Sequence, residues 1–241
     1  MKKYFKWSNI RLLMMFGAVI FLFAFTSKRN EQRHLKNSLV NFAAEDNLFV
    51  TSEMVNKLLI EKNGRPQSVR KDNLDLNILE KTVNKHEMIA QSEVFVTIDG
   101  VLNAVVKPKT PIARVFDQNS SFYIDYEGNR MPLSTLSSAR VPLVSGEFER
   151  LEKKEFADLL RQIHDDPFLK KNIIGMTVAA DGSVKMMNRN YSYEIDFGKP
   201  INKEKKFNNY KAFFQKAVTD SPIINYKKIN LRFTQQVVCT K

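Results

Sequence analysis

Cysteine and histidine are scarce in this chain of 241 residues, which contains one cysteine and three histidines. The single Cys239 excludes an internal disulfide framework and any metal site built on several cysteines. His34, His86 and His164 lie far apart in the sequence, and none of them has the spacing of a metal ligand. The sequence therefore predicts no metal site and a fold that depends on packing alone.

The chain also lacks the short motifs of the common enzyme classes. It contains no Gly-x-Ser-x-Gly, no P-loop and no Gly-x-Gly-x-x-Gly fingerprint. Two pairs of carboxylates, Glu152/Glu155 and Asp165/Asp166, lie at the start and the end of a predicted helix, where they suit the helix dipole and a helix stop. We therefore expect a protein that is not an enzyme and that has no cofactor and no small-molecule substrate.

One long run of apolar residues is present, and it lies near the N-terminus. Residues 12–25 are fourteen consecutive residues without a charged or polar side chain. A membrane-spanning helix needs about 20 residues, and the segment from Trp7 to Thr26 reaches that length if the stem of Arg11 carries its charge back to the interface. The sequence predicts a transmembrane helix over residues 10–27 behind a cytoplasmic stub of residues 1–9.

The charges on either side of this run indicate its orientation. Four basic residues and no acidic residue precede it, which favours a cytoplasmic N-terminus and an exported C-terminal domain, although three basic residues also follow it over 28–33. A cleaved signal peptide is the alternative, but the sequence Ala-Phe-Thr-Ser-Lys-Arg after the run has no good small-x-small cleavage site. A single-pass protein of the cytoplasmic (inner) membrane is expected.

Charge is unevenly distributed along the chain, whose formal net charge is +12. Residues 199–241 hold ten Lys or Arg against Glu204 and Asp220, whereas residues 12–198 are neutral overall. Such a basic C-terminal lobe suits acidic protein, anionic lipid or nucleic acid. Export argues against nucleic acid, and a solvated basic surface without a partner remains an alternative.

Apolar periodicity predicts a β-α-α-β-β module over residues 35–108. A strand over 35–42 precedes two short helices, the second with Leu76, Leu79 and Val83 on one face. Two β-rich runs, 94–98 and 101–106, then flank Asp99-Gly100, which is a strong hairpin signal. The module is thus expected to contain three strands and two helices.

Residues 109–241 are predicted to be rich in strands. The expected strands cover 111–116, 121–125, 128–131, 141–144, 174–179, 183–187, 191–197 and 229–238, with helices over 152–164 and 202–218. The fold class is therefore α+β: one N-terminal transmembrane helix, a β-α-α-β-β module and a strand-rich domain with flanking helices.

The last predicted strand, residues 229–238, has a period-two pattern. Apolar Ile229, Leu231, Phe233 and Val237 alternate with polar residues, which gives one face for a core and one for water. Three residues follow it, too few to cover it at a sheet edge. An uncovered edge offers backbone N–H and C=O groups to another chain.

This order of parts resembles the FtsQ/DivIB family of bacterial cell-division proteins. The resemblance is carried by five segments in the family's order: 47–53, 105–114, 123–132, 141–146 and 229–233. They are similar to the family's entry into its first helix, its Pro-Ile-Ala junction, its Tyr-Asp-Gly hairpin, its Leu-Pro step and its final strand. Asn230 and Phe233 replace the family's usual Asp and Tyr. The short sequences Met-Pro-Leu-Ser and Ala-Arg-Val-Pro-Leu are similar to those of Bacteroidota members of the family.

The resemblance implies a POTRA domain over 35–108 and a β domain over 109–241. Members of this family are non-enzymatic scaffolds of the divisome at the division septum, where they bind FtsB, FtsL and other divisome membrane proteins and help to control septal peptidoglycan synthesis. The β domain's last strand takes a strand from FtsB by β-addition. The corresponding residues here are Arg232, Phe233, Thr234, Gln235, Gln236, Val237 and Val238.

Two further expectations concern this segment and its context. Arg232 is expected to point outward and to pair with acidic residues of the partner, with main-chain bonds supplying affinity. The alternatives to a division scaffold are a POTRA-bearing, chaperone-like module of envelope transport and an exported enzyme on an unrecognised fold. No barrel-forming run of strands follows the first module, which argues against the transport module.

Overall fold

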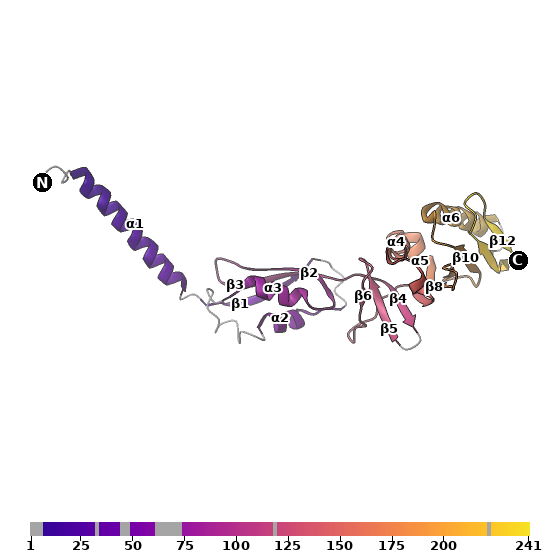
Figure 1. The fold of residues 1–241 in the computed structure, drawn as a ribbon, viewed down its shortest axis with the longest axis horizontal. Helices are drawn as coiled ribbons and strands as arrows, with labels where there is room; N and C mark the ends of the chain where they lie inside the picture. The colour runs from indigo at the N-terminus through magenta and orange to yellow at the C-terminus, as the bar shows by residue number, and fades with distance from the viewer. Residues whose placement is uncertain (1–6, 32–33, 44–48, 61–73, 118–119, 221–222) are drawn as a thin grey trace. The chain divides into compact units, whose positions relative to one another are not determined.

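The computed structural model describes residues 7–31, 34–43, 49–60, 74–117, 120–220 and 223–241. The chain forms two compact units, Met1–Pro108 and Lys109–Lys241. The first contains a long apolar helix and a three-stranded mixed sheet, and the second contains a nine-stranded sheet with flanking helices (Figure 1). The predicted α+β class is confirmed.

Helix α1 (Trp7–Glu31) is long and apolar enough to cross a membrane over Asn9–Arg29. The 21 residues of Asn9–Arg29 extend about 31 Å at 1.5 Å per residue, which matches the thickness of a hydrocarbon core. None of this segment is buried inside the protein. The Thr26 hydroxyl donates to the Leu22 carbonyl at 2.7 Å, so this polar group is satisfied within the helix. Its length and composition fit a membrane anchor, and a signal sequence passes the same test.

The first unit follows the predicted β-α-α-β-β order. Its elements are β1 (Asn37–Phe42), α2 (Ser52–Ile60), α3 (Leu76–Asn84), β2 (Ile89–Val96) and β3 (Val101–Pro108). The sheet order is β1-β3-β2, with β1 parallel and β2 antiparallel to the central β3. Helices α2 and α3 contact each other and the sheet, and they bury Val55, Leu59, Leu79 and Val83. Asp75 caps α3 by accepting a hydrogen bond from the Ile78 amide at 3.1 Å.

The second unit is built on one large mixed sheet with the order β12-β11-β10-β9-β8-β7-β4-β5-β6. The strands are β4 (Pro111–Asp117), β5 (Ser120–Asp125), β6 (Arg130–Met131), β7 (Leu143–Gly146), β8 (Ile173–Val178), β9 (Val184–Asn188), β10 (Glu194–Gly198), β11 (Lys228–Asn230) and β12 (Val238–Thr240). The helices are η3 (Phe148–Arg150), α4 (Lys153–Asp165), α5 (Pro167–Asn172), α6 (Lys203–Asp220) and η4 (Ile223–Asn225).

One hydrophobic core runs along this sheet beneath the helices. Helix α4, which the sequence predicts over residues 152–164, contributes four buried residues: Phe156, Leu159, Leu160 and Ile163. The core continues as far as Ile229 of β11, so the C-terminal end of the sheet belongs to the same packed unit. A buried polar cluster lies within it: Asn188 Nδ2 donates to the Tyr210 hydroxyl, and the hydroxyls of Tyr193 and Tyr210 are 2.9 Å apart. Burial raises the pKa of both tyrosines, so both remain neutral donors and acceptors.

The end of β7 requires a glycine. Gly146 has φ +83°, and a Cβ atom added there would lie 2.2 Å from the Val178 carbonyl oxygen of β8. Gly182, in the β8–β9 turn, has a similar φ of +76°, but the nearest atom to its added Cβ is a side-chain carbon of Leu151 at 3.7 Å. The two glycines therefore share a backbone conformation and differ in the space around them.

We expect Gly146→Ala to lower the free energy of unfolding by about 2–4 kcal/mol, because strain and a backbone clash add together. The control Gly182→Ala carries only the left-handed conformation and should cost about 1 kcal/mol. Thermal unfolding of the full chain in detergent compares the two variants. Equal costs would contradict the assignment of a close backbone approach at Gly146.

Candidate functional site

Strand β12 forms one end of the large sheet, close to the C-terminus (Figure 1). It pairs antiparallel with β11, with Lys228 opposite Thr240 and Asn230 opposite Val238. Within the part of the chain that the structure describes, no strand pairs with its other side. Strands that end a sheet present backbone donors and acceptors that another chain can pair with. This edge is therefore the candidate site for an added strand.

The orientation of the backbone groups follows from one hydrogen bond. The Thr240 carbonyl accepts from the Lys227 amide at 2.8 Å, so it points inward toward the β11 side. Successive residues of an antiparallel strand direct their N–H and C=O groups to opposite edges. The backbone N–H and C=O of Cys239 therefore face the open edge.

The prediction of one continuous strand over residues 229–238 is wrong. The structure divides this segment into β11 and β12, which are joined by residues 231–237. The Asn230 side chain accepts a hydrogen bond from the Arg232 amide at 2.9 Å, and this turn-forming contact ends β11. Ile229 and Leu231 are buried as the alternation predicts, but Phe233 is 53% exposed. The alternation of apolar and polar residues thus continues beyond Asn230, where β11 ends.

The predicted partner-binding residues consequently lie mainly outside a strand. Arg232 to Val237 form the connection between β11 and β12, and only Val238 belongs to β12. The connection is held in place, because the Thr234 carbonyl accepts a hydrogen bond from Asn209 of α6 at 3.0 Å. Sequence reasoning omitted Cys239 and Thr240, which complete the edge strand. The turn-forming Asn230 and the β-branched pair Val237-Val238 are the local signals that could have shown the break.

A buried carboxylate links strand β10 to β11 and to the connection between β11 and β12. Asp196 of β10 is 1% exposed, and its two oxygens contact Lys228 Nζ at 2.8 Å and Arg232 Nε at 2.9 Å. Burial alone would raise the pKa of this carboxyl, but the two cationic donors outweigh it and lower the pKa. The stem of Arg232 lies over Gly198, where an added Cβ would come within 2.8 Å of Arg232 Cγ.

Arg232 already has a partner within its own domain. Its guanidinium makes an ion pair within the domain, although its side chain remains 48% exposed. Lys206 of α6 is also structural: it is 2% exposed, and its ammonium donates to the carbonyls of Phe197 and Lys199 at 2.8 Å each. Burial lowers the pKa of Lys206. The exposed lysines of the basic lobe are Lys199, Lys205, Lys216, Lys227 and Lys241.

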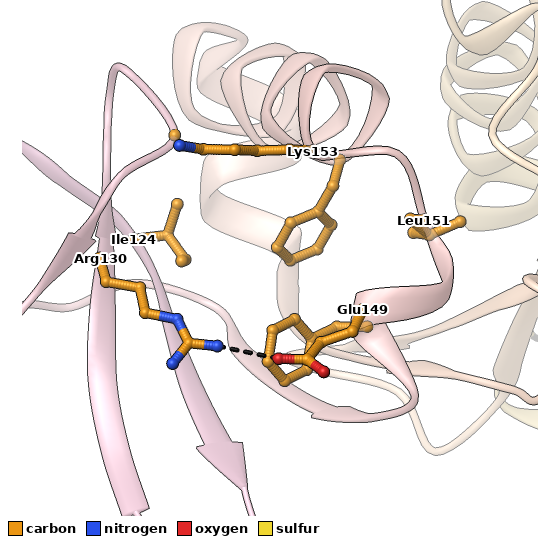
Figure 2. Close-up of a pocket in the computed structure, with 8 residues that line it drawn as sticks. Ile124, Arg130, Glu149, Leu151 and Lys153 are labelled. Atoms are coloured by element: carbon orange, nitrogen blue, oxygen red, sulfur yellow. Dashed lines mark hydrogen bonds and ion pairs between the residues drawn. The ribbon is translucent and has the colours of Figure 1, made fainter.

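A hollow lies at the other half of the large sheet. It has a volume of about 460 Å³ and is lined by Ile124, Gly128, Arg130, Phe148, Glu149, Leu151, Lys153 and Phe156. Figure 2 shows Arg130 and Glu149 joined by a hydrogen-bonded ion pair of 2.9 Å, and Lys153 on the opposite wall. Most of the lining residues are apolar, and Arg130 and Glu149 already neutralise each other. The hollow therefore suits an apolar side chain better than a reacting group.

The three histidines occupy unrelated places. His34 precedes β1, His86 accepts a hydrogen bond from the Met88 amide at 3.3 Å after α3 has ended, and His164 lies in the last turn of α4. No group of three or more His, Cys, Asp or Glu residues within the described ranges is placed to hold a metal ion. Cys239, the single cysteine, lies half-buried in β12 and is a free thiol.

Comparison with known proteins assigns the second unit. A family model described as "FtsQ/DivIB, C-terminal related" matches residues 110–240, which is more than half of the chain. A search of curated proteins finds no match. The matched region spans all strands of the large sheet, from β4 to the last residue of β12. The chain therefore belongs to the FtsQ/DivIB family, through this C-terminal related domain.

Proposed function

We propose that this protein is a membrane-anchored, non-enzymatic scaffold of the cell-division machinery that receives a strand from a partner protein at β12. The observation that carries the proposal is an unpaired sheet edge within the domain that matches the FtsQ/DivIB model. The family resemblance names FtsB as the donor of the strand and FtsL as its companion. The match also favours this role over that of an envelope transport module, which the first unit alone would allow.

The contacts that β12 offers are few and specific. Its three residues provide the outward backbone groups of Cys239 for pairing with an added strand. Val238 is 42% exposed and Phe233 is 53% exposed, which gives apolar surface beside the edge. Main-chain bonds would align the added strand, and these side chains would add affinity and specificity.

Charge gives the partner strand a preferred sequence. The exposed Lys227 and Lys241 lie at the same end of the β11–β12 hairpin, because the Lys227 amide bonds to the Thr240 carbonyl. Acidic residues on the partner that face this end would speed the encounter and fix the register. This assigns to two lysines the pairing role that the sequence suggested for Arg232.

The membrane anchor would assist binding at this edge. With α1 in the inner membrane and the N-terminus in the cytoplasm, the second unit lies outside the cytoplasm and is confined close to the membrane at the septum. A single-pass partner in the same membrane is confined likewise, and such confinement raises the effective concentration of the two binding surfaces. Control of septal peptidoglycan synthesis then follows from the assembly of these partners rather than from any chemistry of this chain.

Cys239→Pro tests the edge directly. Proline removes the outward N–H, and an edge strand tolerates proline when that N–H faces solvent. We expect the affinity for FtsB to fall about fivefold, which corresponds to the loss of one hydrogen bond of about 1 kcal/mol, in pull-down and titration experiments with the full chain in detergent. Cys239→Ala is the matched control, since it keeps the N–H and should bind normally. Equal affinity of the two variants, with equal unfolding temperatures, would remove β12 as the site.

Asp196→Asn tests the support beneath this edge. Because the folded-state pKa of Asp196 is lowered, its stabilisation is present above the usual carboxyl pKa of about 4 and is lost as the pH falls through the folded value. At pH 7 the variant should lose about 1.5–3 kcal/mol of unfolding free energy, the value of hydrogen bonds to a charged group.

Urea unfolding of the full chain at pH 7 and at pH 3 measures this effect. The difference between the wild type and Asp196→Asn should shrink at the lower pH. Glu149→Gln is the control, because its ion pair with Arg130 is exposed and should contribute little at either pH. A difference that is the same at both pH values would show that the charge of Asp196 does not stabilise this region.

A further inference from the structure

The turn between β2 and β3 presents an apolar side chain to its surroundings. Ile98 is 82% exposed, more than any other large apolar side chain among the described residues, those of α1 included. The turn is closed by hydrogen bonds from the Gly100 amide to the Thr97 carbonyl at 3.0 Å and from the Thr97 amide to the Val101 carbonyl at 2.9 Å. Ile98 is thus held outward at the tip of an ordered hairpin.

This tip lies beside the chain segment that follows α1. The Lys36 amide donates to the Gly100 carbonyl at 2.8 Å, and a Cβ added at Gly100 would lie 3.2 Å from the His34 carbonyl oxygen. His34 comes three residues after Glu31, where α1 ends. Three residues span at most about 10 Å. The hairpin tip is therefore tethered within a short reach of the end of the apolar helix.

The charges near this point match a lipid surface. Lys28 and Arg29 in the last turns of α1 and Lys36, just before β1, are all exposed. Two acidic residues belong to the same segments: Glu31 ends α1, and Asp99 lies at the hairpin tip. Basic residues next to the end of a membrane helix attract anionic headgroups, and an exposed apolar side chain beside them can enter the headgroup layer.

A single exposed isoleucine is ordinary on a protein surface and needs no partner. What distinguishes Ile98 is its place, since the backbone contacts of Gly100 fix the hairpin tip to the residues that leave α1. Exposed Ile224 of η4, at 73%, has no such connection to a membrane segment within its own unit.

We propose that the β2–β3 hairpin tip, through Ile98, contacts the headgroup layer of the membrane at the surface where α1 ends. Ile98 enters the layer, and Lys28, Arg29 and Lys36 face anionic lipid headgroups around it. This second contact restricts how the three-stranded sheet swings about the end of α1. The inference rests on the anchoring role of α1 in the proposed function.

Single-site labelling of the full chain tests the contact. Cys239→Ser removes the only thiol, after which Ile98→Cys carries an environment-sensitive NBD label. Gln91→Cys is the matched control, since Gln91 is exposed on β2 and pairs with Lys107 at the opposite end of the same hairpin. Both proteins are reconstituted in vesicles of phosphatidylglycerol and phosphatidylethanolamine, and in phosphatidylcholine vesicles for comparison.

At position 98 we expect emission at shorter wavelength and quenching by headgroup-labelled lipid that is several-fold stronger than at position 91. The effect should be larger in the vesicles that contain phosphatidylglycerol. Equal quenching at the two positions would overturn the proposal. Vesicle flotation separates the two hypotheses: a chain that does not float refutes the anchor, whereas a floating chain with an aqueous label at position 98 refutes only the hairpin contact.

Discussion

A buried carboxylate must be matched by positive charge, and this constraint organises the C-terminal end of the large sheet. Asp196 lies in β10 almost without solvent contact, and an unpaired ion in such a place costs several kcal/mol. Its two partners come from β11 and from the connection that follows. The ion pairs therefore hold β11 and the first residues of the connection that leads to β12. The position of the edge strand thus depends on the charge of Asp196, two strands away in the sheet.

The same constraint changes how the basic lobe should be understood. Lys206, Lys228 and Arg232 bind carbonyl or carboxylate groups of their own domain, so their charges serve the fold first. Lys227 and Lys241 remain exposed at one end of the β11–β12 hairpin. The net charge of residues 199–241 thus overstates the positive charge that a partner meets, and it does not show where on the surface that charge lies.

Local signals predicted most of the fold, because each element was encoded by neighbouring residues. Asp99-Gly100 marks a hairpin that the structure contains, and the apolar face of α4 is buried as its spacing indicates. The break in the last strand was missed because period-two alternation fits one strand or two. The Asp196–Arg232 ion pair joins residues 36 positions apart, and sheet order likewise depends on distant pairing. Neither is visible in a local pattern.

The shortness of β12 bears on how such an edge can serve a scaffold. A three-residue edge strand is too short to template aggregation between copies, which protects the protein in isolation. It is also too short to hold a partner tightly by main-chain bonds alone, since each contributes only about 1 kcal/mol net. Affinity must then come from side chains beside the edge and from confinement in one membrane. In the proposed scaffold, α1 is consequently part of the binding mechanism, because it supplies the local concentration that the edge strand requires.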